Sequence, residues 1–173
     1  MQGIAEQTLA EPLLQEFREE AGITRRVLER VPAEKLSWKP HPKSMSLGAL
    51  ALHIATVPGA LARIVSQDGF DVSQGNFNPP DAKNLEEILA AHEQSVIDAE
   101  KCLAEMTDDQ ARGNWRLTLH DKELFTKPRI GIARSIMLNH WIHHRGQLSV
   151  YLRLLEVPVP VIYGRSADEN PFG

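Results

Sequence analysis

The chain lacks several features that would assign it to a large class of proteins. Among its 173 residues there is one cysteine, Cys102, which excludes an internal disulfide and is typical of a reducing compartment. Asp and Glu (23) outnumber Lys and Arg (19), and the net charge of -4 offers no electrostatic footprint for nucleic acid. Residues 1–14 do not resemble a signal peptide, and no stretch reads as a membrane span. We therefore expect a cytoplasmic protein with neither a nucleic-acid nor a membrane partner.

Several catalytic motifs are also absent. The sequence has no Gly-x-Ser-x-Gly nucleophile elbow and no glycine-rich loop that would bind phosphate. The metalloprotease pattern His-Glu-x-x-His would need a glutamate after His140, but Trp141 stands there. The Glu-x-x-His pairs of di-iron bundles are missing, since Met137 precedes His140 by three residues and Leu50 precedes His53. These absences argue against a zincin-type protease and against a di-iron carboxylate protein.

The sequence does contain a dense group of histidines near residues 138–147. Three of the seven histidines, His140, His143 and His144, fall in this stretch. Apolar residues at helical spacing flank it on both sides, which predicts that the stretch lies inside one long helix. The chemistry of this protein is therefore sought first on that helix.

The pair His140 and His144 is a candidate for binding a metal ion. On a helical wheel His144 lies about 40° from His140, and Gln147 and Tyr151 lie within about 20° of it. A row of polar side chains thus follows a buried face, where unpaired polar groups are costly. The i, i+4 spacing aims two imidazoles at one point. The alternative is a pair of core histidines that are satisfied within the protein.

A metal site needs a third ligand, and three other histidines are candidates. His53 and His92 lie on separate predicted helices, and His92 is the more central of the two on its wheel. His92 could equally be a polar residue on a partly exposed helix, and sequence spacing does not choose between them. His143 is an alternative ligand on the same helix as His140; otherwise it supports the ligands or contacts a partner.

Four stretches show the apolar spacing and the capping residues of helices. Pro12 suits the first turn of one helix, Ser46 is a plausible N-cap, and Asn84 with Glu87 begins a capping box. Pro58 and Gly59 are expected to interrupt the second helix. The predicted helices run from Pro12 to about Val31, from Ser46, from Asn84 to about Glu105, and from near Pro128 to before Pro158.

The segments between these helices are predicted to be long. Residues 36–42 form an ordered loop pinned by Trp38, and residues 67–81 form a polar connection. Residues 115–125 alternate enough for a hairpin across His120–Lys122, although an irregular crossover is the alternative. We predict one domain over residues 1–173, an all-α four-helix bundle with long crossover loops and an extended C-terminal tail. The long connections leave the order of the helices open.

A series of short motifs along the chain carries a resemblance to a known family. The sequence resembles the DinB family of four-helix metal proteins over nearly its whole length. The stretch from His143 to Leu148 is the most specific of these motifs, and the others are weak singly but fall in the right order. The motifs are Val31-Pro32, Trp38-Lys39-Pro40, Ser46-Leu47-Gly48, Leu52-His53-Ile54, Asn139-His140, His143-His144-Arg145-Gly146-Gln147-Leu148, Tyr163-Gly164 and Ser166-Ala167-Asp168.

The resemblance implies a metal ion held by His53, His140 and His144, and it also implies a homodimer. It leaves His92 as a structural residue. Relatives in this family include thiol-dependent S-transferases that use bacillithiol, mycothiol or glutathione, and an isomerase domain with a similar bundle. Three neutral imidazoles suit Zn, Ni or another late divalent metal, and three protein ligands leave a coordination position open.

Several other residues have two interpretations. Arg145 pairs with a carboxylate at the surface or binds an anionic substrate group. Cys102 is read as a small core residue, and Trp38 and Trp141 either fill the core or line a substrate pocket. The tail residues Tyr163, Ser166 and Asp168 cover a pocket or lie at a dimer contact.

Three functions compete for the predicted site. The first is a metal-dependent transferase that activates a low-molecular-weight thiol for attack on an electrophilic small molecule, because a coordinated thiol loses its proton without a separate base. The second is a metal-dependent small-molecule hydrolase, which needs a carboxylate base such as Asp168. The third is a non-enzymatic metal-binding stress protein.

Overall fold

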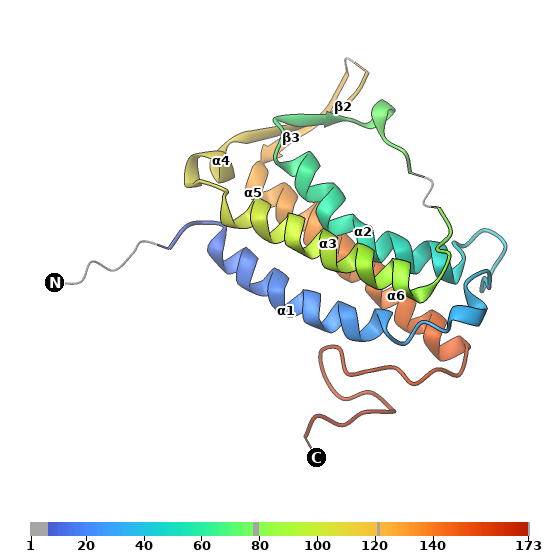
Figure 1. Ribbon diagram of the computed structural model, residues 1–173. Coiled ribbons are helices and arrows are strands. Elements are labelled where there is room, and N and C mark those ends of the chain that lie inside the picture. Colours follow the sequence, from blue (N-terminus) through green and yellow to red (C-terminus); the bar gives the residue numbers. More distant parts are fainter. Residues whose placement is uncertain (1–6, 78–79, 121, 173) are drawn as a thin grey trace.

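The computed structural model describes residues 7–77, 80–120 and 122–172. Long helices dominate the fold (Figure 1). The last of them runs without a break from Arg129 to Leu154, and its middle part, η3, is π-helical. The elements that build the bundle are α1 (Glu11–Leu28), α2 (Leu47–Val65), α3 (Leu85–Ala104), α5 (Arg129–Ile132), η3 (Ala133–Asn139) and α6 (His140–Leu154).

The helices begin where their capping residues predict. The Ser46 hydroxyl accepts a hydrogen bond from the backbone N–H of Ala49 at 3.0 Å, and Asn84 Oδ1 accepts one from Glu87 at 2.8 Å. A capping box formed by Thr107 and Gln110 begins the short helix α4 (Asp108–Arg112). Helix α1 ends at Leu28, before the predicted end at Val31, and continues as turns.

The side-chain contacts between helices fix their directions. Helix α3 runs in the same direction as α2: Gly59 contacts Ser95, and Ser66, seven residues later, contacts Cys102, seven residues after Ser95. These two helices are therefore parallel. Along α6 the order is reversed: Trp141 contacts Ile54 of α2, and the later Tyr151 contacts Met45, just before α2 begins, so α2 and α6 are antiparallel. Helices α2 and α3 both run from the same end of the molecule, so the connection between them returns to that end (Figure 1). The order is therefore not up-down-up-down.

A small sheet makes the all-α prediction wrong in part. Strands β2 (Asn114–Leu119) and β3 (Lys122–Pro128) form the predicted antiparallel hairpin, whose turn residue Asp121 lies outside the described residues. The unexpected strand is β1 (Gly69–Asp71), which pairs parallel to β2. Three residues are too short to show an alternating pattern, and the pairing depends on a segment more than forty residues later. The fold is thus mostly helical with a three-stranded sheet at one end.

Helix α2 continues through Pro58 and Gly59 instead of being interrupted there. A Cβ added at Gly59 would lie 2.9 Å from Cα of Ser95, so this glycine lets α2 and α3 approach closely. Gly59 also donates its backbone N–H to the Ser95 hydroxyl at 2.7 Å. The Pro-Gly pair is therefore part of a tight helix-helix contact.

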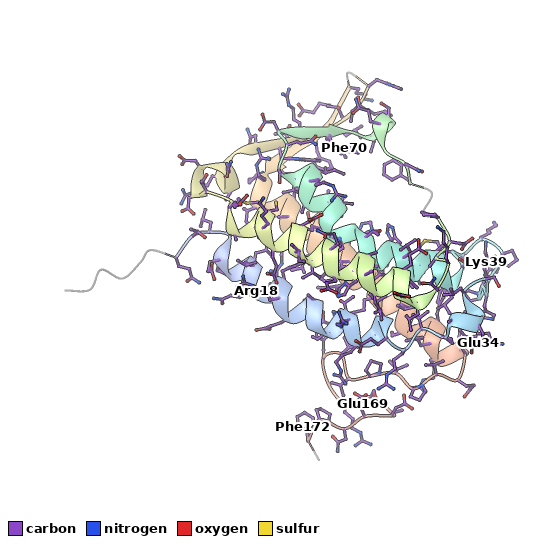
Figure 2. All side chains as sticks on the ribbon, in the orientation of Figure 1. Arg18, Glu34, Lys39, Phe70, Glu169 and Phe172 are labelled. Carbon is purple, nitrogen blue, oxygen red and sulfur yellow. The ribbon has the colours of Figure 1, made fainter. Side chains whose placement is uncertain are left out.

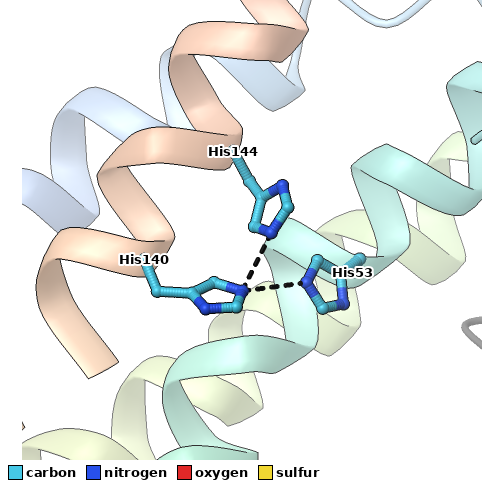
Figure 3. A group of neighbouring side chains, drawn as sticks. All are labelled: His53, His140 and His144. Atoms are coloured by element: carbon cyan, nitrogen blue, oxygen red, sulfur yellow. Dashed lines mark hydrogen bonds between the residues drawn. The ribbon is translucent and has the colours of Figure 1, made fainter. Parts of the chain in front are cut away.

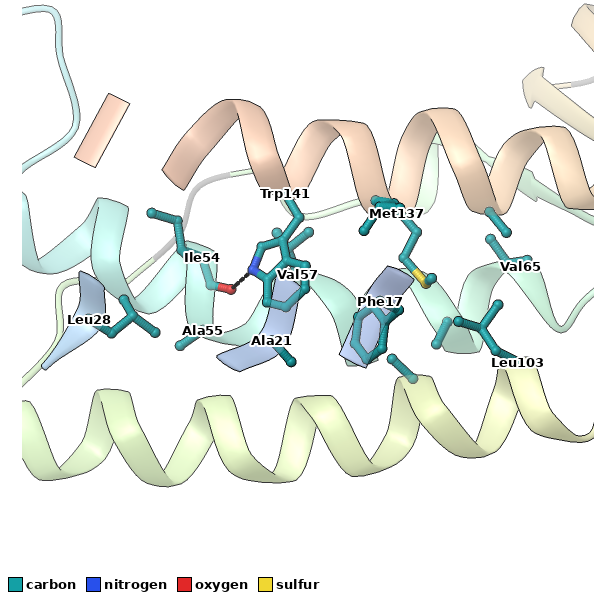
Figure 4. Close-up of a cluster of buried hydrophobic side chains, with 14 of the residues drawn as sticks. Phe17, Ala21, Leu28, Ile54, Ala55, Val57, Val65, Leu103, Met137 and Trp141 are labelled. Atoms are coloured by element: carbon teal, nitrogen blue, oxygen red, sulfur yellow. Dashed lines mark hydrogen bonds between the residues drawn. The ribbon is translucent and has the colours of Figure 1, made fainter. Parts of the chain in front are cut away.

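Helix α2 carries the most apolar sequence of the fold. By length and composition it would suffice to cross a membrane, which differs from the expectation from sequence, but 67% of the apolar window is buried inside the bundle. Its side chains pack with Phe17, Met137 and Trp141 in the core (Figure 4). The apolar composition of α2 therefore fits a core helix.

The residues after α6 form no helix or strand up to residue 172, as the extended tail predicts. This tail lies against α1 and α6, and Glu169 pairs with Arg26 of α1 and with Arg30 in the turn that follows it (Figures 1 and 2). Asp168 pairs with Arg153 of α6. Charged side chains thus attach the tail to the outside of the bundle.

Candidate metal centre

Three of the predicted ligands meet between α2 and α6. Nε2 of His140 lies 2.8 Å from Nε2 of His144 and 3.4 Å from Nε2 of His53 (Figure 3). One ring nitrogen from each of the three residues lies within 4.8 Å of the others. Each side chain is half-buried, so the cluster is reachable from solvent. The structure thus brings together the three histidines that the family resemblance implies as ligands.

The local sequence explains this convergence. His140 and His144 are one helical turn apart at the start of α6, so their side chains leave the helix on the same face. His53 lies on the neighbouring helix α2, which runs antiparallel to α6. The π-helical segment η3 ends directly before His140, and such segments often occur beside functional sites.

Gln147 orients the ring of His144. Its Oε1 lies 2.8 Å from Nδ1 of His144, and because a carbonyl oxygen only accepts, Nδ1 carries the hydrogen in this contact. The other nitrogen, Nε2, then keeps its lone pair and points at His53 and His140. A supporting acceptor of this kind is what holds a metal-binding imidazole in one tautomer.

The environment favours the neutral form of all three rings. Burial, followed by the neighbouring His144 and His140, lowers the pKa of His53 from 6.5 to about 4. Burial also lowers the pKa of His140 and of His144 below its usual value, although Gln147 opposes the shift at His144. Neutral imidazole is the form that binds metal, so these rings are ready to do so at neutral pH.

The donor set fits a late divalent ion. Nitrogen atoms bound to one ion about 2.1 Å away lie about 3 to 3.5 Å apart, close to the two separations seen here. Neither α2 nor the continuous helix 129–154 contains an aspartate or a glutamate. Three converging nitrogen lone pairs without a carboxylate suit Zn, Ni or a similar ion better than Mg or Ca, which prefer oxygen ligands.

The other candidate histidines lie outside this cluster. His92 is 2% exposed and packs in the core, so the idea of a partly exposed position is wrong. Its Nε2 contacts the carbonyl oxygen of Ala21 at 3.3 Å, and its Nδ1 has no hydrogen-bond partner among the described residues. His143 is exposed, with its ring centroid 5.1 Å from that of His144. The role of His143 as a supporting or interface residue stays a prediction.

Arg145 does not form the surface ion pair expected from sequence, because its side chain is 1% exposed. Nη1 lies 2.5 Å from a carboxylate oxygen of Glu20 and donates to the Thr24 hydroxyl at 3.1 Å. Nη2 donates to the phenolic oxygen of Tyr163 at 2.6 Å, and the Tyr163 hydroxyl donates to Glu20. This network joins α1, α6 and the tail. No sequence pattern pairs Glu20 with a residue so distant in the chain.

The other residues considered in the sequence analysis make packing contacts, hydrogen bonds or ion pairs within the protein. Trp141 is buried in the core, and Trp38 packs edge-on against Tyr151 with centroids 5.6 Å apart. Burial raises the pKa of the Cys102 thiol, which contacts Ser66 and is unsuited to act as a nucleophile at neutral pH. Asp168 is held by Arg153 and by the backbone of Val159, which makes it a poor candidate for a general base.

Comparison with known proteins agrees with this architecture. The profile of the DinB family matches residues 6–170. The uncharacterized protein YjoA of Bacillus subtilis (strain 168) is 26% identical over 145 residues, which cover 82% of this chain and 87% of YjoA. Two crystal structures have the same fold. A DinB-like protein from Bacillus cereus ATCC 10987 is 24% identical, with a TM-score of 0.69 and coverage of 91% of this chain and 99% of its own. The crystal structure of YjoA is 20% identical to this chain, with a TM-score of 0.68, and the match covers 88% of this chain and 96% of YjoA.

Proposed function

The chain belongs to the DinB family, and from this premise we propose that it binds one divalent metal ion through His53, His140 and His144. We further propose that it is a transferase that uses this site to present a low-molecular-weight thiol to an electrophilic small molecule. When bound, the ion lowers the pKa of a coordinated thiol enough to yield the thiolate at neutral pH. The thiol sulfur would form a bond to the electrophilic atom while the bond from that atom to its leaving group or ring heteroatom breaks, and the thiol proton would pass to solvent or to the leaving group.

The observation that carries this proposal is the composition of the site. Three neutral imidazoles add no charge to a divalent ion, and neither of the two helices that hold them contributes a carboxylate. The ion would keep its two positive charges and an open position, so an anionic ligand such as a thiolate is favoured there. The role of the protein is to keep the imidazoles neutral by burying them and to orient their rings, as the contact from Gln147 does for His144.

The same observation ranks the hydrolase second. Hydrolysis by a coordinated water molecule usually needs a carboxylate that accepts its proton. Among the described residues, the imidazole rings of the three histidines contact other histidines and Gln147. The expected base, Asp168 of the tail, forms an ion pair with Arg153 of α6. A non-enzymatic metal-binding protein is ranked below both, because three ligands leave the coordination sphere open.

The test is an assay of thiol conjugation. Protein loaded with Zn²⁺ or Ni²⁺ is mixed with a thiol such as glutathione, bacillithiol or mycothiol and a model electrophile, and the loss of free thiol is followed. We expect a rate above the uncatalysed reaction for the metal-loaded protein and no such rate for His140→Ala. Equal rates for the two proteins with every thiol would contradict the transferase.

Two further predictions accompany this proposal. The resemblance implies a homodimer, which sedimentation of the purified protein tests directly. The cytoplasmic location expected from the single cysteine also stays a prediction, and fractionation of the source cells tests it.

A further inference from the structure

Pro58 leaves a carbonyl group of α2 without its usual partner. In an α-helix the N–H of each residue donates to the carbonyl four residues earlier, and proline has no N–H, so the carbonyl of Ile54 lacks this bond. The indole Nε1–H of Trp141 donates to this same oxygen at 2.8 Å inside the core (Figure 4). Trp141 therefore supplies the hydrogen bond that Pro58 removes.

The indole ring is held in place from other sides of the bundle. It stacks on Phe17 of α1 with ring centroids 5.2 Å apart, and His92 of α3 lies 6.0 Å away. Only 1% of Trp141 is exposed. Because α1 and α3 fix the ring and Pro58 provides the free acceptor, the bond from α6 to α2 can form in one position along the helices.

This bond connects the neighbours of two predicted metal ligands. Ile54 follows His53 in the chain, and Trp141 follows His140. We propose that Trp141 is a positioning residue for the metal centre: its bond to Ile54 sets the separation and register of α2 and α6 at which the imidazoles of His53 and His140 can share one ion. The proposal rests on the metal site proposed above. Trp141 is not one of the three proposed ligands, and it acts on them through the backbone of α2.

The first experiment compares two tryptophan variants. Trp141→Phe keeps an aromatic ring in the core and removes the donor. Trp115→Phe is the matched control, because Trp115 is also 1% exposed and donates to another carbonyl of α2, that of Ile64, at 3.2 Å. Ile64 lies towards the far end of α2 from His53. The readouts are the dissociation constant for Co²⁺ alone, its visible absorption spectrum, and the melting temperature of the metal-free protein.

A positioning role predicts different results for the two variants. We expect Trp141→Phe to bind Co²⁺ about tenfold or more weakly and with altered absorption bands, since loss of a supporting group costs that much in metal sites. Trp115→Phe should lower the melting temperature and leave the affinity for Co²⁺ unchanged. Equal affinity in Trp141→Phe and in the original protein would overturn the proposal.

A second variant separates positioning from simple stability. Pro58→Ala restores an N–H that can donate to the Ile54 carbonyl, so it should recover the melting temperature lost in Trp141→Phe. The double variant should still bind Co²⁺ weakly, because the connection from α6 to α2 is still missing. If affinity recovers together with stability, Trp141 is only structural. If the original protein binds Co²⁺ no better than His140→Ala, the proposed metal site fails and this inference fails with it.

Discussion

Gln147 lies about one turn after His144 on the same helix, and its side-chain oxygen is 2.8 Å from Nδ1 of His144. This contact leaves Nε2 of His144 facing the other two imidazoles. The ring orientation at the site is therefore set by a residue that is not itself a candidate ligand.

Replacing Gln147 should change metal affinity without changing the three histidines. We expect Gln147→Ala to weaken Zn²⁺ binding by about 10- to 100-fold, because the supporting acceptor of His144 is lost. Gln147→Glu should bind at least as tightly as the original protein, since a carboxylate is a stronger acceptor for Nδ1–H. Competition with a chromophoric chelator measures both, and Gln94→Ala on α3 is the control. Equal affinities for Gln147→Ala and the original protein would show that this contact does not support the site.

Histidine variants should separate ligands from bystanders. Loss of a residue that only supports a ligand typically weakens metal binding by about 10- to 100-fold. We expect His53→Ala, His140→Ala and His144→Ala each to weaken Zn²⁺ binding by more than this. His143→Ala should bind Zn²⁺ about as tightly as the original protein, because the exposed ring of His143 lies outside the cluster. Titration of each variant with Zn²⁺ measures this difference. A larger loss in His143→Ala than in His53→Ala would mean that His143 is the third ligand.

The stability of the metal-free protein should depend on pH in acid. The pKa of His53 is about 4 in the folded chain, against the ordinary value of 6.5 that applies to the unfolded chain. Between these two pH values the unfolded chain therefore binds a proton that the folded chain does not. The free energy of unfolding should therefore fall as the pH drops from about 6.5 to about 4 and stay level, from this group, above 6.5. Urea unfolding across this range measures the slope. His53→Asn should have a shallower slope, and an identical slope would contradict the prediction.

Bound metal should stabilise the fold, because its ligands come from two helices that separate on unfolding. We expect a chelator to lower the melting temperature of the metal-loaded protein and to leave that of His140→Ala unchanged. Differential scanning calorimetry at fixed protein concentration measures the shift. An unchanged melting temperature after the metal has been shown to leave the protein would contradict this expectation.

The buried pair Arg145–Glu20 should be costly to break from one side. Arg145→Leu leaves the Glu20 carboxylate buried without its cation, which costs about 3–5 kcal/mol in comparable pairs. The double variant Arg145→Leu/Glu20→Leu should lose less than Arg145→Leu alone. Tyr163→Phe removes the hydroxyl that accepts a hydrogen bond from Arg145 and donates one to Glu20, and it should cost about 1–3 kcal/mol. Urea unfolding measures all three, and a larger loss in the double variant than in Arg145→Leu would contradict this account.

The parts of the structure that local chemistry dictates were predictable from sequence. Ser46, Asn84 and Thr107 each begin a helix through a hydrogen bond that spans three residues, so the signal lies within a few positions. The selection of His140 and His144 rested on one helical turn. Choosing His53 over His92 needed the family resemblance, because helical wheels do not tell which faces of two helices meet.

The features that sequence missed all depend on distant partners. Strand β1 is defined by its pairing with β2, and the burial of Arg145 depends on Glu20 and Tyr163 from opposite ends of the chain. Pro58 gave a warning of a break in α2, but the compensating donor is the indole of Trp141 on another helix. Local patterns therefore predicted the helices, and contacts between segments distant in the chain decided the rest.

The most direct test of the account is the position of the ion itself. Crystals of protein shown in solution to carry Zn²⁺ or Ni²⁺ would be measured at the absorption edge of that metal, and the anomalous difference map calculated. We expect one strong peak within bonding distance of Nε2 of His53, His140 and His144. A map with no peak between these three residues, or with its peak on other side chains, would contradict it.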